Sequence, residues 1–276
     1  MKKIFVNLKR FDIPQEKNGI SAVKNIFDYG YEIVSELEKG ISKENNLDSV
    51  TIFFPEAHII SAIKTKKSNS IIKIGCQSVF RDDVAKGGNF GAFTTNRTAS
   101  SAVALGCECT IIGHCEERKD KMEIMLEAGV KNETAVSRIL NKEVKAAINA
   151  GLDVLFCIGE TTEEQPRQAE VLEAQLKEGL AGVDLSKVVI GYEPIWAIGP
   201  GKTPPQREYI EKTAKLIKSI VQCPVVYGGG LKKDNARMLY SIDEIDGGLI
   251  ALTRFSGNIG FYPNECIEII NTYIRK

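Results

Sequence analysis

Short, almost uninterrupted apolar runs alternate along this chain with longer stretches in which apolar residues recur every three or four positions. VTIFF at 50–54 and VLFCI at 154–158 are typical of the short runs. A strand without alternating polar positions is buried on both faces, as in a parallel sheet covered by helices. The runs predict strands at Lys3–Lys9, Ser49–Pro55, Ile71–Gln77, Cys109–His114, Asp153–Glu160, Lys187–Glu193, Pro224–Gly230 and Asp246–Arg254.

The longer stretches have the period of a helix. Between Thr203 and Val221, for example, Ile210, Ala214 and Ile217 form one apolar stripe. A threonine followed by proline is a favourable helix start, so this helix is predicted to begin at Thr203. Further helices are predicted over 21–39, 57–68, 136–149 and 168–180 and from Pro263 onward, and the segment 30–48 is expected to lengthen the first helix or its exit loop.

Strands that alternate with helices are compatible with an open doubly wound sheet or with a closed (β/α)8 barrel. No linker or shift in composition divides the 276 residues. The glycine-rich GxGxxG turn of a dinucleotide-binding fold is missing after the first run, where NLKRFD occupies 7–12. The sequence therefore predicts an α/β protein with a single (β/α)8 TIM barrel domain over residues 1–276.

The charges balance, with 36 basic and 36 acidic residues. Nucleic acids and anionic membranes bind basic surfaces, so neither is expected as a partner. No secretory signal or membrane-spanning run is recognisable, which predicts a cytoplasmic location. The seven cysteines lie scattered through apolar segments without a zinc-binding spacing, so free buried thiols are expected and no metal site is predicted.

In such a barrel the active site lies at the carboxyl ends of the strands. The residues at those ends include lysine, histidine and glutamate, the side chains needed for proton transfer beside a developing oxyanion. They are Asn7, Lys9, Gln77, His114, Glu160 and Glu193, followed by Gly228–Gly230 and Ala251–Arg254 at the last two strands.

Each of these residues also has an ordinary structural interpretation. Lys9 alone is typical of a solvated lysine, and Glu160 of an acidic residue at a helix start. His58, in the predicted helix 57–68, is expected to lie on the surface. His114 precedes a predicted helix start at Cys115, where the helix N-terminus disfavours the imidazolium and favours a neutral donor. Convergence of these residues on one site depends on the barrel.

Seven segments carry a more specific signal: NLK at 7–9, GAFT at 91–94, IIGHCEER at 111–118, CIGE at 157–160, YEPIWAIGPGK at 192–202, YGG at 227–229 and DGGLI at 246–250. In this order, over nearly the whole chain, they resemble triosephosphate isomerase. The resemblance implies a cofactor-free enzyme of glycolysis and gluconeogenesis. It would interconvert glyceraldehyde 3-phosphate and dihydroxyacetone phosphate through an enediolate.

The resemblance also implies roles for individual residues. Glu193 would be the base that moves the proton, and His114 would polarise the carbonyl. Lys9 would offset negative charge, Asn7 would orient the substrate and Glu116 would support Lys9. The segment 194–202 resembles the family's lid, which closes over the substrate.

Backbone amides of Gly199, Gly230, Ala251 and Leu252 would bind the phosphate group. Here the chain departs from the family, which usually has a serine at the position of Gly230 and two glycines at those of Ala251 and Leu252. The added Cβ atoms narrow the approach of an anion to the backbone. Arg254 either compensates with its charge or points outward at the rim.

A homodimer is expected through the loop Gly91–Asn96, which reads GAFTTN where the family has GAFTGE. Glu117 replaces a family arginine, so Asn96–Arg97 and Glu117 are candidates to restore the family's intersubunit ion pair with its charges exchanged. Cys115 replaces a family serine. Two alternatives remain open: the same chemistry on another small sugar phosphate, such as a tetrulose phosphate, and a non-catalytic paralogue that binds a sugar phosphate.

Overall fold

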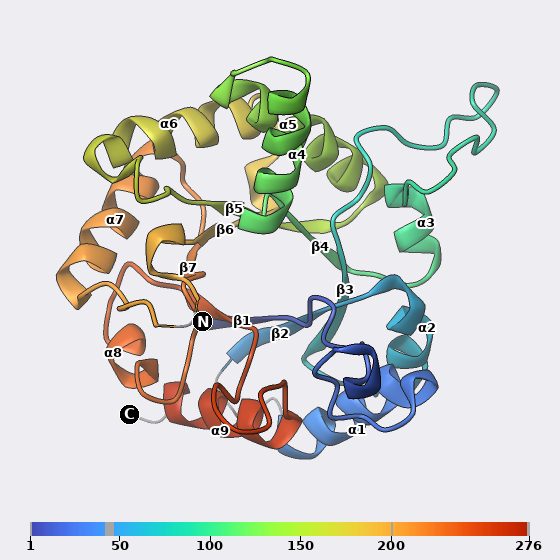
Figure 1. Ribbon diagram of the computed structural model, residues 1–276. Helices are drawn as coiled ribbons and strands as arrows, with labels where there is room; N and C mark the ends of the chain where they lie inside the picture. The colour runs from blue at the N-terminus through green and yellow to red at the C-terminus, as the bar shows by residue number, and fades with distance from the viewer. Residues whose placement is uncertain (1, 42–46, 200, 275–276) are drawn as a thin grey trace.

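The structure, a computed structural model, describes residues 2–41, 47–199 and 201–274. Parallel strands close one barrel in chain order, and helices surround it, as Figure 1 shows. The predicted (β/α)8 barrel is confirmed. The strands are β1 Lys2–Asn7, β2 Leu47–Phe54, β3 Ile72–Gln77, β4 Cys109–Ile112, β5 Asp153–Ile158, β6 Val188–Tyr192, β7 Val225–Tyr227 and β8 Gly247–Ile250.

Side chains along each strand alternate between two apolar cores. Phe5, Phe53 and Leu155 pack inside the barrel, and Ile4 and Val6 pack outward against the helices. The covering helices are α1 Tyr29–Gly40, α2 Glu56–Thr65, α3 Ala99–Ala104, α4 Cys115–Glu127, α5 Glu133–Ala150, α6 Gln168–Gly179, α7 Arg207–Ile220, α8 Ala236–Tyr240 and α9 Pro263–Ile274. Both strand faces are buried, which explains the uninterrupted apolar runs.

Several predicted boundaries were wrong. β1 ends at Asn7 and β8 at Ile250, because the chain leaves the sheet at the barrel rim; Lys9 already has a φ of 42°. α7 begins at Arg207, since two consecutive prolines keep the preceding residues extended. α1 ends at Gly40, and the rest of the expected extension, 42–46, lies outside the described residues.

The seven cysteines are free, as predicted, and six of them are buried. Within the described residues, no helix is long and apolar enough to span a membrane.

His58 was predicted to lie on the surface, but it is 3% exposed. Its Nε2 lies 3.1 Å from Asp12 Oδ2, and its ring packs on Tyr29 with the centroids 4.8 Å apart. Arg10 donates to both oxygens of the same carboxylate, at 3.0 and 2.9 Å. This cluster ties the loop after β1 to α2.

We expect Asp12→Ala to lower the free energy of unfolding by about 1–3 kcal/mol, because it leaves the buried imidazole of His58 without its partner. Urea denaturation measures the change, with the exposed Asp120→Ala as the matched control. Equal stability of the two variants would show that the Asp12–His58 contact contributes nothing.

Candidate active site

The alternation of side chains decides which strand-end residues enter the barrel. Val189 of β6 contacts the inner core, so Glu193, four positions later, points to the interior as well. Cys157 of β5 is also an inner residue, and Glu160, three positions later, lies on the outer side. Strand geometry therefore directs Glu193 into the site and Glu160 away from it.

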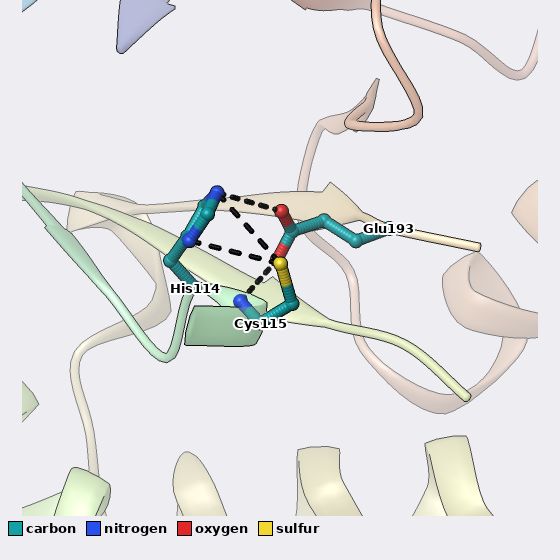
Figure 2. Close-up of side chains that lie close together, drawn as sticks. All are labelled: His114, Cys115 and Glu193. Carbon is teal, nitrogen blue, oxygen red and sulfur yellow. Dashed lines mark hydrogen bonds and ion pairs between the residues drawn. The ribbon is translucent and has the colours of Figure 1, made fainter. Parts of the chain in front are cut away.

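The carboxylate of Glu193 is held at the N-terminus of α4. Its Oε1 lies 3.1 Å from His114 Nε2, and its Oε2 accepts from the Cys115 amide at 3.0 Å (Figure 2). Glu193 is only 2% exposed. The N-terminal end of a helix stabilises an anion, so this position favours the charged carboxylate.

His114 caps α4, and its hydrogen bonds define its tautomer. Nδ1 accepts from the Glu116 amide at 3.3 Å, so the ring proton lies on Nε2 and faces Glu193. The potential ligand atoms of His114, Cys115 and Glu193 lie within 4.8 Å of one another, but a protonated Nε2 has no lone pair for a metal. Burial and the Glu193 charge raise the pKa of the Cys115 thiol. The geometry suits a neutral imidazole donor.

Lys9 is fixed through its backbone and its side chain. Its amide donates to Asn7 Oδ1 at 3.0 Å, and its carbonyl accepts from Gln77 Nε2 at 2.9 Å. Its Nζ donates to Glu116 Oε1 at 2.6 Å; burial alone would raise the pKa of Glu116, but this contact outweighs it and lowers that pKa. These four residues and His114 line a cavity of about 210 Å³. Gln77 was recognised in the sequence only as a strand end, without a role.

The candidate lid, residues 194–202, is held near its first residues by a hydrogen-bond network around Glu160. Trp196 Nε1 donates to Glu160 Oε1 at 2.9 Å, as do two tyrosine hydroxyls, each at 2.9 Å. Glu160 is fully buried and serves as the anchor of this network. Beyond the hinge, Gly199 has a φ of 118°, which a side chain disfavours, and Pro200 lies outside the described residues.

At the other side of the barrel mouth, Gly230 lies in the turn after β7 with a φ of 95°, and Ala251 and Leu252 follow β8. Arg254 does not supply a charge here. Its Nε donates to Glu265 Oε1 of α9 at 2.8 Å, and its guanidinium stacks on a tyrosine ring. Of the two predicted orientations of Arg254, the structure has the outward one.

The sequence model of the triosephosphate isomerase family matches residues 24–259. The chain belongs to the triosephosphate isomerase family. Triosephosphate isomerase of Geobacter metallireducens is 35% identical over 236 residues, which cover 79% of this chain and 85% of that protein. The enzyme of Chloroherpeton thalassium is 34% identical over 218 residues, covering 74% and 77%.

The fold agrees with this assignment. The crystal structure of triosephosphate isomerase from Bartonella henselae superposes with a TM-score of 0.71 at 22% identity, covering 99% of each chain. At this identity the likeness concerns the barrel alone.

Two residues that depart from the triosephosphate isomerase pattern have partners within this chain. Glu117 accepts from Ser78 Oγ at 2.6 Å and from Lys121 Nζ at 3.0 Å. Arg97 donates to the Ser78 carbonyl at 3.3 Å and lies 3.7 Å from Glu56. An exchanged intersubunit pair between Arg97 and Glu117 would have to break these contacts.

Proposed function

We propose that this protein interconverts glyceraldehyde 3-phosphate and dihydroxyacetone phosphate, with Glu193 as the base and His114 as the electrophile. The observation that carries the proposal is the pair itself: the buried carboxylate of Glu193 has its Oε1 3.1 Å from Nε2 of His114. Lys9 lies on the same cavity wall as His114. A binding protein would need the lysine but not a positioned base.

In this mechanism Glu193 takes the proton from C2 of the aldose and returns it to C1, which yields the ketose. The Nε2–H of His114 donates to the substrate oxygens as charge develops on them, and the ammonium of Lys9 stabilises the enediolate. A neutral imidazole is better suited than an imidazolium to donate a hydrogen bond to an enediolate oxygen. Triosephosphate isomerase is itself the standard example of an enzyme that keeps its catalytic histidine neutral. No cofactor is required by these steps.

Both oxygens of Glu193 are occupied, by His114 and by the Cys115 amide. The carboxylate must therefore leave the α4 N-terminus before it can reach a substrate carbon. Glu193 directly precedes the candidate lid, so closure of the lid and movement of the base would be coupled. Closure would also expel water and strengthen the electrostatic interactions in the site.

The remaining choice is between a three-carbon and a four-carbon substrate. Steady-state rates with glyceraldehyde 3-phosphate and with erythrulose 4-phosphate, each with 2-phosphoglycolate as the inhibitor, test it. We expect the triose phosphate to have the higher kcat/KM, with strong inhibition. A higher kcat/KM for the four-carbon sugar would establish the alternative isomerase, and absence of turnover with retained binding would establish a non-catalytic paralogue.

We further propose a homodimer through the loop Gly91–Asn96. The connection between β3 and α3 that contains this loop extends away from the barrel, at the upper right of Figure 1, and its Phe90 is 84% exposed. A cavity of about 500 Å³ lies between the base of this connection and α4, where Ile124 is 63% exposed. In a two-fold dimer each connection would enter the cavity of the other copy.

We expect Phe90→Asp to convert the dimer to a monomer, because a charge replaces an apolar contact at the centre of the interface. Sedimentation velocity measures the mass, for which one chain contributes 30.4 kDa. Phe27→Asp is the matched control, because Phe27 is also a highly exposed aromatic residue (85%) but lies outside the proposed interface. This variant should remain dimeric. A monomeric parent protein would refute the proposed dimer.

We also propose that residues 1–276 form one domain, which the single closed barrel of β1–β8 supports. A cytoplasmic location remains a prediction.

A further inference from the structure

One cation at the mouth of the barrel is held in place without a carboxylate. Lys232 follows Gly230 in the turn after β7, and a Cβ added to Gly230 would lie 3.6 Å from its Cε. The lysine side chain therefore folds back over Gly230. Its Nζ lies 4.1 Å from the ring centroid of Phe255, which belongs to the loop after β8. Lys232 thus reaches across from the β7 turn to the β8 loop.

Hydrogen bonds fix the turn that carries this lysine. The Lys232 amide donates to Asn235 Oδ1 at 2.8 Å, and Asn235 Nδ2 donates to the Gly230 carbonyl at 2.9 Å. The neighbouring Leu231 amide donates to the Leu249 carbonyl of β8 at 2.8 Å. These contacts place the β7 turn directly beside the end of β8, where Ala251 and Leu252 follow.

The neighbouring cations are neutralised. Lys233 pairs with Glu268 at 2.9 Å, and Arg254 pairs with Glu265. Among the described residues, none forms an ion pair with Lys232. An aromatic ring attracts a cation without cancelling its charge, so Phe255 holds the ammonium and leaves it available to an anion.

We propose that Lys232 is a side-chain ligand for the phosphate group of the substrate at the corner formed by Gly230, Ala251 and Leu252. The Cβ atoms of the last two residues restrict access to their amides, and an ammonium at the rim supplies attraction that needs no close backbone approach. This inference rests on the proposed isomerase function. Phe255 acts as a positioning residue for the ammonium.

The test compares Lys232→Met with Lys233→Met, which removes the same charge from the adjacent, carboxylate-paired position. We expect Lys232→Met to raise KM for glyceraldehyde 3-phosphate by about 10–100-fold, the loss of one charge-assisted hydrogen bond, with a smaller change in kcat. Lys233→Met should leave KM within about twofold, since exposed ion pairs contribute little. Lys232→Arg should recover part of the affinity, and Phe255→Leu should raise KM by a few-fold through loss of the ring face.

Binding of inorganic phosphate, followed by 31P NMR, separates this inference from the proposed function. Weaker phosphate binding in Lys232→Met than in Lys233→Met supports the inference even if the parent protein does not isomerise the triose phosphate. Equal phosphate affinities and equal KM values in the two variants would overturn it, whatever the turnover of the parent protein.

Discussion

Glu193→Gln will lower kcat by about 10³–10⁴-fold, the upper part of the range for a general base, because it removes the carboxylate that we propose as the base. In the structure the carboxylate of Glu193 is the one that faces His114 Nε2 at 3.1 Å. The amide has the same shape but cannot take a proton at neutral pH. The initial rate with glyceraldehyde 3-phosphate gives kcat and KM, and KM should change much less than kcat.

Glu127→Gln is the matched control, since Glu127 is exposed and lies at the C-terminal end of α4, opposite the N-terminal end that contacts Glu193. Both variants should melt close to the parent temperature, which separates lost chemistry from lost folding. If Glu193→Gln retained more than about a tenth of the parent kcat, far above the residual rate expected after removal of a general base, another group would have to be the base.

The second large effect is expected at the electrophile. His114→Asn will lower kcat/KM by about 10²–10³-fold, the usual loss on removing one preorganised donor at an oxyanion. Asparagine keeps an acceptor for the Glu116 amide and is a favoured N-cap, so α4 should remain intact. The shorter side chain cannot carry its donor to the position of Nε2.

His58→Asn is the control, because His58 is the other histidine of the chain. It should reduce stability and leave kcat/KM of the folded protein nearly unchanged. In the parent protein, 15N NMR should detect His114 as the neutral tautomer with its proton on Nε2. A charged imidazole, or a loss below about tenfold in His114→Asn, would contradict the proposed donor role.

The fold was predictable because the strands are buried on both faces and therefore leave uninterrupted apolar runs. The positions of Asn7 and Glu193 followed from the same pattern, since parallel strands deliver their carboxyl ends to one rim. The sequence does not show whether the side chain of Glu160 points into the barrel or away from it, because Glu160 lies beyond the last paired residue of its strand. In the structure Glu160 points outward, and its Oε1 accepts a hydrogen bond from Trp196 Nε1 at 2.9 Å.

Other features depend on contacts between distant segments. His58 carries no local sign of burial, and its partner Asp12 lies 46 residues earlier. The outward orientation of Arg254 depends on Glu265 in α9. The contact of Lys232 with Phe255 arises only when β7 and β8 lie side by side. Periodicity and motif spacing contain no information on such pairings.

The measurement that tests the central claim most directly is the steady-state isomerisation of glyceraldehyde 3-phosphate by the purified protein, with Glu193→Gln as the blank. We predict a kcat/KM of about 10⁷–10⁸ M⁻¹ s⁻¹, near the diffusional ceiling, that is lower by about 10³–10⁴-fold in the blank. Turnover equal to that of Glu193→Gln would contradict the assignment of this site as a triose-phosphate isomerase centre.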